Sequence, residues 1–88
     1  MGRRRSPLTI ARAKEIYRQL LELGETSTPI LFQRISEKNP RITYSILYQI
    51  LRFLKSKGLV EQRARGRISY WKVIRVLDEN QLDQVLRK

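Results

Sequence analysis

The 88-residue sequence contains no cysteine and no histidine. Without cysteine the chain can form no disulfide, and it offers no thiolate as a nucleophile or a metal ligand. Without histidine it lacks both the commonest metal ligand of proteins and their commonest general base. Its acidic residues are scattered and it has no glycine-rich phosphate loop. We therefore predict no catalytic residues, no metal site, no cofactor and no enzymatic activity.

Long apolar segments are missing as well. No apolar run reaches the roughly 18–20 residues that a membrane-spanning helix needs, and no signal peptide is visible. We therefore expect a soluble, cytoplasmic protein without a membrane partner. Because a chain of this size has a small core and no disulfide, self-association is the remaining way to bury more surface.

Positive charge is what the chain has in excess. Its 19 basic and 8 acidic side chains give a formal net charge of +11. Residues 1–77 hold 17 of the basic groups and 5 of the acidic ones, whereas residues 78–88 hold 2 and 3. A basic body of this kind indicates a polyanionic partner, most often nucleic acid and less often an anionic membrane.

The most informative segment runs from Ile42 to Gly58. Thr43 is a good N-cap, and Gly58 stands where a helix commonly ends in a left-handed residue. Apolar residues recur between them at three- and four-residue steps, which predicts a helix over residues 43–57. That stripe consists of Leu47, Ile50, Leu51 and Leu54.

The opposite face of this predicted helix has no acidic residue, and almost every position on it can form a hydrogen bond. It consists of Tyr44, Ser45, Tyr48, Gln49, Arg52 and Lys55. An ordinary solvated helix face mixes glutamate with lysine. The pattern therefore favours a helix that lies against DNA, with a plain amphipathic core helix as the alternative.

A first helix is predicted upstream. Ser6-Pro7 combines an N-cap with proline at the first helical position, and Gly24 would end the helix after Leu23. Its predicted core face consists of Ile10, Ala13, Tyr17, Leu20 and Leu21, widened by Ile16 and Leu23.

A second, short helix is predicted between these two. Thr28-Pro29 repeats the signal of a cap followed by proline, and the helix would run from Pro29 to about Lys38. A small hydroxyl beside the free N–H groups of a helix N-terminus makes a phosphate site, so Thr28 is a candidate DNA contact. Capping alone would also explain it. Two short helices with a tight connection are typical of a helix-turn-helix.

The arginines at the start of the chain form a second candidate contact. Residues 1–6 are a basic arm in which Arg3, Arg4 and Arg5 could follow a phosphate backbone or enter a minor groove. Disordered, solvated charge explains them equally well.

Residues 59–76 change to a period of two, which predicts two strands joined at Arg65-Gly66. A two-residue loop at that place would pair Ala64 with Arg67, Gln62 with Ser69 and Val60 with Trp71. The face predicted to join the core consists of Val60, Ala64, Trp71 and Val73.

Three arginines cluster at the tip of this predicted hairpin: Arg63, Arg65 and Arg67. Their mutual repulsion favours a contact with phosphate or with a minor groove. The alternative is a solvated basic turn that merely resists pairing between sheet edges.

A last short helix is predicted within residues 77–88. Asp78 and Gln81 are spaced as a capping box. The apolar stripe of this helix consists of Leu82, Val85 and Leu86. It could pack on the first helix or on a second copy of the chain, and we favour the second copy, as a dimer contact.

The order of these features resembles a winged helix-turn-helix domain. Three predicted helices are followed by Gly58-Leu59-Val60, then Arg65-Gly66-Arg67, then Tyr70-Trp71, and this spacing is similar to the ArsR, MarR and PadR groups of bacterial and archaeal transcription regulators. The resemblance covers about residues 8–76. It implies an α+β fold with three helices, a two-stranded β-hairpin wing and a short C-terminal helix. The chain would then divide into a basic arm (1–6), the winged domain (7–76) and the C-terminal helix (77–88).

In such proteins the third helix lies in the major groove and the wing touches the adjacent backbone or minor groove. The resemblance thus implies that the polar face of helix 43–57 meets the groove and that the three tip arginines lie on the wing. Metal-sensing relatives carry Cys or His ligands, and ligand-sensing relatives have longer flanking helices. This chain has neither feature, so we expect no small-molecule effector.

Our leading hypothesis is a sequence-specific, homodimeric regulator of transcription that binds double-stranded DNA. Gln49 could pair with adenine, and Arg52 with guanine or a phosphate. Ser45 could take either role, and Tyr44 and Tyr48 would hold phosphates or touch a thymine methyl. The alternative is a DNA-coating plasmid partition or nucleoid-associated protein that spreads along the duplex. A third class is a winged helix that binds protein or RNA within a larger assembly.

Overall fold

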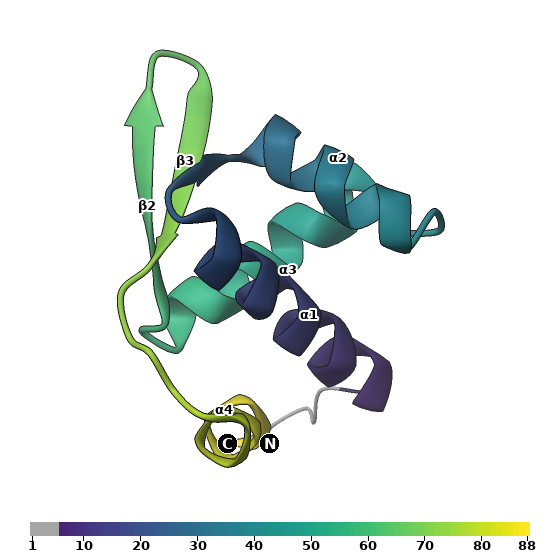
Figure 1. Cartoon of the computed structure of the whole chain (residues 1–88), viewed down its shortest axis with the longest axis vertical. Coiled ribbons are helices and arrows are strands. Elements are labelled where there is room, and N and C mark those ends of the chain that lie inside the picture. Colours follow the sequence, from purple (N-terminus) through teal and green to yellow (C-terminus); the bar gives the residue numbers. More distant parts are fainter. Residues whose placement is uncertain (1–5) are drawn as a thin grey trace, which may run out of the picture.

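Seven helices and strands follow one another along residues 6–88, the part of the chain that the computed structural model describes. In chain order they are α1 (Pro7–Leu23), β1 (Thr26–Ser27), α2 (Thr28–Lys38), α3 (Tyr44–Ser56), β2 (Val60–Arg65), β3 (Ile68–Val73) and α4 (Glu79–Arg87). This part of the chain is therefore α+β, with four helices and one three-stranded antiparallel sheet. Figure 1 shows the β2–β3 hairpin and α4 at opposite ends of the molecule, with α1, α2 and α3 between them.

The predicted starts of α1 and α3 and the predicted end of α1 are confirmed. The Ser6 hydroxyl accepts a hydrogen bond from the backbone N–H of Thr9 (3.2 Å), and Gly24 follows α1 with a φ of 74°. The Thr43 hydroxyl accepts a hydrogen bond from the backbone N–H of Ile46 in the same way (3.1 Å). Both caps satisfy an N–H group that the first turn of a helix leaves without a helical partner.

The cap of α2 differs from the prediction. The hydroxyl of Ser27, and not that of Thr28, accepts the hydrogen bond from the backbone N–H of Ile30 (3.4 Å). Thr28 is instead the first helical residue, and Pro29 follows it inside the first turn. Proline fits there because the first N–H groups of a helix have no helical acceptor.

β3 is the central strand of the sheet, with β1 on one side and β2 on the other. The hairpin was predicted, but β1 was not. In β1, Thr26 pairs with Trp71 and Ser27 pairs with Tyr70. This two-residue strand connects the end of α1 to the hairpin, and it brings the N-terminus of α2 beside β3.

The turn of the hairpin lies one residue later than predicted. Arg65 pairs with Ile68, so the two loop residues are Gly66 and Arg67. The favoured two-residue turns need a positive φ at their first position, which glycine adopts without strain. Gly66 occupies that position with a φ of 63°. The predicted loop would have placed Arg65 there instead.

The predicted strand register is therefore wrong by two residues, because each residue of β2 pairs with the residue of β3 two positions after its expected partner. The observed register pairs Ala64 with Ser69, Gln62 with Trp71 and Val60 with Val73. Paired residues share a face of the sheet, so this shift leaves Val60, Trp71 and Val73 on one face, as predicted. Ala64 shares that face but lies near the tip, beyond the core, and it is exposed.

The core lies between the three N-terminal helices and the inner face of the sheet, and α4 closes one end of it. Trp71 is fully buried, as predicted. The buried apolar residues are Ile10, Ala13, Ile16, Tyr17, Leu20, Leu31, Ile35, Ile42, Leu47, Ile50, Leu51, Phe53, Leu54, Leu59, Val60, Trp71, Leu82 and Leu86. The prediction for Leu21 is wrong, because this side chain is 40% exposed. The buried stripe of α1 passes through Leu20, and Leu21 falls beside it.

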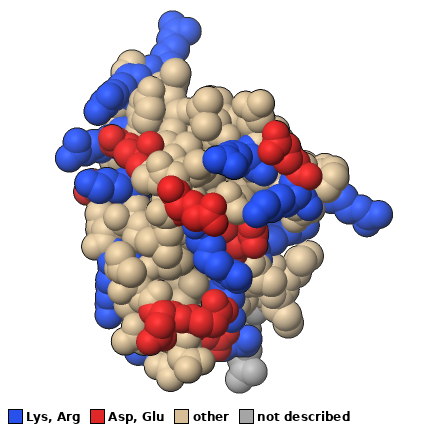
Figure 2. All heavy atoms as spheres, viewed as in Figure 1, with Lys and Arg blue, Asp and Glu red and all other residues tan. Residues whose placement is uncertain are grey.

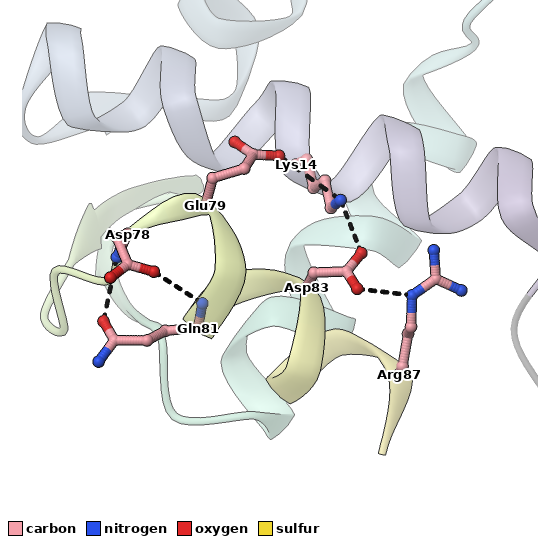
Figure 3. Close-up of polar contacts among 6 residues, drawn as sticks. All are labelled: Lys14, Asp78, Glu79, Gln81, Asp83 and Arg87. Atoms are coloured by element: carbon pink, nitrogen blue, oxygen red, sulfur yellow. Dashed lines mark hydrogen bonds and ion pairs between the residues drawn. The ribbon is translucent and has the colours of Figure 1, made fainter.

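The capping box of α4 is confirmed. The Asp78 carboxylate accepts a hydrogen bond from the Gln81 backbone N–H (2.8 Å), and the Gln81 side chain accepts one from the Asp78 N–H (3.1 Å) (Figure 3). Leu82 and Leu86 are buried within this single chain, where α4 packs on α1. The apolar stripe of α4 is thus used within the chain, in contrast to the dimer contact that we favoured from the sequence.

An ion-pair cluster holds α4 on α1. Lys14 of α1 lies 2.7 Å from Asp83 and 3.5 Å from Glu79, and Arg87 donates a hydrogen bond to Asp83 (2.8 Å) (Figure 3). The hydrogen bond to Asp83 raises the pKa of Lys14 above its ordinary value. The hydrogen bonds from Lys14 and then Arg87 lower the pKa of Asp83. Each shift favours the charged form, so the cluster contributes to docking at neutral pH.

Candidate nucleic-acid interface

The outward face of α3 carries six of the predicted DNA contacts on one helix. Tyr48 is half-buried, and the other five are exposed: Tyr44, Ser45, Gln49, Arg52 and Lys55. No acidic residue lies in α3. The opposite stripe is buried in the core and the Thr43 cap fixes the first turn, so this polar face is presented on a firmly anchored helix.

Charge is unevenly distributed over the molecule. Figure 2 shows basic side chains projecting at the hairpin end and a group of acidic side chains at the α4 end. Three of the eight acidic residues of the chain, Asp78, Glu79 and Asp83, belong to α4 and its cap. A polyanion would therefore approach α3 and the hairpin more favourably than α4.

Tyr44 lies at the start of α3, where that helix meets α2. Its ring centroid is 5.4 Å from that of Phe32, with the two rings tilted by 58°. Phe32 is half-buried and Tyr44 remains 45% exposed. The aromatic pair therefore supports Tyr44 from one side and leaves nearly half of its surface open to a ligand.

Tyr48 and Lys55 both form a hydrogen bond with Gln62, which was not among the predicted DNA contacts. Gln62 of β2 donates a hydrogen bond from Nε2 to the Tyr48 hydroxyl (3.0 Å) and accepts one at Oε1 from Lys55 Nζ (3.1 Å). A further bond runs from Gln62 Nε2 to the Ser69 hydroxyl (2.9 Å). One amide thus joins α3 to both strands of the hairpin. The predicted register placed Gln62 opposite Ser69 and gave no sign of its contacts with α3.

Thr28 is buried, and both functions of its hydroxyl are used inside the protein. Its Oγ1 accepts a hydrogen bond from Trp71 Nε1 (2.7 Å) and donates one to the Ser69 carbonyl (3.1 Å). Only 2% of Thr28 is exposed. This geometry gives Thr28 a structural role, and we leave it out of the proposed interface.

The hairpin arginines are exposed and make weak contacts. Arg63 lies 3.8 Å from Glu61, and Arg65 lies 3.9 Å from Glu25. The Arg65 guanidinium also lies over the Tyr70 ring, 5.2 Å from its centroid. Exposed ion pairs contribute about 0–1 kcal/mol, so these arginines can exchange them for a stronger anion at little cost.

The three hairpin arginines do not all face α3. Side chains alternate along a strand, so Arg63 and Arg65 project from the face of β2 opposite to Gln62. Arg67 lies in the two-residue loop and is exposed. The structure thus brings Gln62 to the polar face of α3, and it places Arg63 and Arg65 on the other side of the sheet.

A hollow of about 170 Å³ opens beside Gln49, between α1 and α3. Its lining consists of Thr9, Arg12, Ile46, Gln49, Ile50 and Phe53. Arg12 is half-buried, and within residues 6–88 its buried Nε has no hydrogen-bond partner. A cationic side chain therefore lies beside Gln49, which adds to the positive charge around this part of α3.

Arg3, Arg4 and Arg5 precede the described residues. Their contact with DNA stays a prediction from the sequence.

Comparisons with known proteins place the chain in no family. No family model, no curated protein and no solved structure matches it significantly. Within residues 6–88, no helix combines the length and the apolar character that crossing a membrane requires. The geometry and charge of α3 and the hairpin are therefore the basis for a functional proposal.

Proposed function

We propose that this chain is a winged helix-turn-helix protein that binds double-stranded DNA and regulates transcription in the nucleoid of a bacterial or archaeal cell. α2 and α3 would form the helix-turn-helix, with α3 in the major groove and the β2–β3 hairpin as a wing on the adjacent backbone or minor groove. The observation that carries this proposal is the exposed face of α3, which has many hydrogen-bonding groups and no carboxylate. Such a face suits a groove bordered by phosphates, because a carboxylate there would be repelled.

Gln49 and Arg52 are the candidates for base recognition. A glutamine amide can bond to both N6 and N7 of adenine, and a guanidinium can bond to both O6 and N7 of guanine. Tyr44 and Arg67 suit phosphate contacts, which set position and affinity but carry no sequence information directly. Loss of Gln49 should therefore change sequence preference, whereas loss of Arg67 should change affinity for every sequence.

Selection from a randomised duplex pool, followed by fluorescence anisotropy at about 50 and 200 mM salt, tests the proposal. We expect an enriched motif that still binds at the higher salt. Gln49→Ala should relax the preference at one base pair by about 1–3 kcal/mol. Gln84→Ala, the same change on an exposed position of α4, is the matched control and should bind as the wild type does. An equal loss on all sequences would contradict the role of Gln49.

A homodimer is part of this proposal. Two copies related by a two-fold axis would place their α3 helices about 34–36 Å apart on an inverted repeat. The stripe of α4 is buried against α1, so pairing needs another surface. Exposed apolar side chains elsewhere include Ile74 (52% exposed) and Val76 (77%). An enriched motif without any repeat would count against the dimer.

A second candidate is a DNA-coating protein of the plasmid partition or nucleoid-associated kind. The observation that favours it is the position of Arg63 and Arg65, which extend the basic surface to the sheet face away from α3. Titration with duplexes of increasing length separates the two candidates. Cooperative spreading, no enriched motif and an affinity that collapses as salt rises would support coating.

A further inference from the structure

The Gln62 side chain occupies the junction between α3 and the hairpin, and its amide is fully used. Its oxygen accepts a hydrogen bond from Lys55 Nζ, and its nitrogen donates to the hydroxyls of Tyr48 and Ser69. The chemistry of the partners fixes the orientation of the amide. A lysine ammonium has donors only, so the amide oxygen must face Lys55 and both N–H groups must point to the two hydroxyls.

This orientation decides what the Tyr48 hydroxyl can do. A phenol has one proton to donate, besides its capacity to accept. Tyr48 accepts from Gln62, and among the described residues its own proton has no acceptor. Lys55 gives Gln62 one of three N–H donors, and the described residues provide no acceptor for the other two. The junction therefore presents several unused donors, one of them cationic.

The Tyr48 ring is fixed in place by the core. The edge of one ring meets the face of the other between Tyr48 and Trp71, with centroids 5.7 Å apart and planes at 81°. Trp71 is fully buried, and its indole N–H is bonded to Thr28. A donor whose position is already fixed loses less conformational entropy when it binds a ligand.

Carboxylates are kept away from this junction. α3 has none, and Glu61 lies on the opposite face of β2, beside Arg63. Glutamate at position 62 could accept from the same partners but would cancel the charge of Lys55. Glutamine holds Lys55 and Tyr48 in place and leaves that charge free to act on a ligand.

We propose that the Tyr48 hydroxyl and the Lys55 ammonium, both held by Gln62, bind one phosphodiester group of a nucleic-acid backbone at the junction of α3 and the hairpin. This inference rests on the proposed function and adds a phosphate site to it. Gln62 is a positioning residue that acts through Tyr48 and Lys55. It also ties the hairpin to α3, so it sets the distance between the contacts that each of them makes.

The test measures DNA affinity by fluorescence anisotropy over a series of salt concentrations, on a selected duplex and on an unrelated one. Gln62→Met keeps the size of the side chain and removes its hydrogen bonds, and Gln62→Glu keeps an acceptor but adds a negative charge. We expect Gln62→Met to weaken binding to both duplexes by roughly tenfold, the scale of one hydrogen bond to a charged group. Gln62→Glu should weaken it further and should lower the slope of log affinity against log salt by about one. Gln84→Met on α4 is the matched control and should change neither quantity.

Tyr48→Phe gives a second route to the same question, because it keeps the ring against Trp71 and removes only the hydroxyl. Both Tyr48→Phe and Gln62→Met disrupt the same hydrogen bond, so their effects on DNA affinity should overlap. The double variant should therefore lose much less affinity than the product of the two single fold-changes. Thermal unfolding of each variant confirms that the fold is retained. A duplex series with one neutral methylphosphonate linkage at a time then locates the phosphate. One linkage should weaken the wild type, and the same linkage should have little effect on the double variant Tyr48→Phe/Lys55→Gln, which has lost both proposed contacts with that phosphate.

Each outcome separates this inference from the function on which it rests. A wild type that binds no duplex would overturn both. A wild type that binds DNA while Gln62→Glu and Tyr48→Phe bind equally well would overturn the phosphate site alone. A change in sequence preference, without a uniform loss of affinity, would also overturn it, since that result would indicate a contact with bases.

Discussion

Thr28→Val removes the contact that fixes Trp71 in the core. The Trp71 indole N–H donates to the Thr28 hydroxyl at 2.7 Å, and both residues are buried. Valine has nearly the shape of threonine, so the substitution opens no cavity but leaves the indole N–H without an acceptor. A buried, unsatisfied donor costs about 1–3 kcal/mol. In a domain of this size, each kcal/mol corresponds to about 4–8 °C in Tm.

Two measurements on the same residue would test this prediction. Trp71 is the only tryptophan, so its fluorescence reports urea unfolding and its single indole N–H resonance reports local protection from hydrogen exchange. We expect Thr28→Val to lose 1–3 kcal/mol in the free energy of unfolding (about the cost of one unsatisfied donor) and to exchange its indole proton faster. Thr28→Ser is the matched control. It keeps the acceptor, loses about 0.8 kcal/mol for one buried methyl group, and should leave the indole proton protected.

A Thr28→Val protein that matches the wild type in both the free energy of unfolding and the indole exchange rate would show that the hydrogen bond to Trp71 does not stabilise the fold. The variant also decides between the two roles considered for Thr28. A phosphate contact would lower DNA affinity without changing stability, whereas the observed geometry predicts a loss of stability first.

Three further predictions concern the rest of the molecule. Leu86→Ala should lower the free energy of unfolding by about 2–5 kcal/mol, because Leu86 is buried where α4 packs on α1. A wild-type Tm that rises with protein concentration would instead indicate that α4 packs between two copies of the chain. The pKa of Asp83 is lowered by Lys14 and then Arg87, so the ionised Asp83 carboxylate should stabilise the fold above about pH 4. This stabilisation should be lost as pH falls through the lowered pKa, which urea unfolding between about pH 2 and 6 would show. Asp83→Asn should remove this pH dependence. The raised pKa of Lys14 predicts a second loss at alkaline pH, above its ordinary value. Arg67→Gln should lower the salt slope of DNA binding by about one while leaving sequence preference unchanged, and a change in preference would contradict a phosphate contact.

Local signals predicted the helices well. In the caps of α1, α3 and α4, a hydroxyl or a carboxylate accepts a hydrogen bond from the backbone N–H group three residues later, and such spacing is visible in the sequence. The buried stripe of α3 was predicted for a similar reason, since its period follows from helix geometry alone. The class, α+β, follows from the change of period after Gly58.

Features that depend on distant partners were not predictable in this way. β1 has two residues, too few for a period, and it exists because Thr26 and Ser27 meet β3 more than forty residues later. Ser27 and Thr28 both suit a cap by residue type. The Thr28 hydroxyl accepts the hydrogen bond from the Trp71 indole, and Ser27 forms the cap. The apolar stripe of α4 packs within the chain because α1 has an uncovered surface that accepts it, and the sequence does not reveal that surface.

The candidate interface also combines a part that local sequence predicts with a part that depends on distant contacts. The polar face of α3 was predictable because it lies opposite the apolar stripe, whose three- and four-residue spacing is visible in the sequence. Gln62 was not, because its role depends on hydrogen bonds with Lys55 and Tyr48 of α3, and these exist only because the hairpin packs beside that helix.

The proposed phosphate site predicts that stability and DNA binding are coupled at the junction of α3 and the hairpin. A chain without disulfides must position its hairpin through side-chain contacts, and four of these run in series from the core to the surface: Thr28 to Trp71, Trp71 to Tyr48, Tyr48 to Gln62, and Gln62 to Lys55. A change at the buried end should therefore reach the exposed donors, although Thr28 itself touches no ligand. Thr28→Val should lower DNA affinity only to the extent that it loosens Tyr48, so the loss should be smaller in Thr28→Val/Tyr48→Phe than the two single losses together. If the losses multiply independently, the core and the phosphate donors are not coupled and Gln62 alone positions Tyr48.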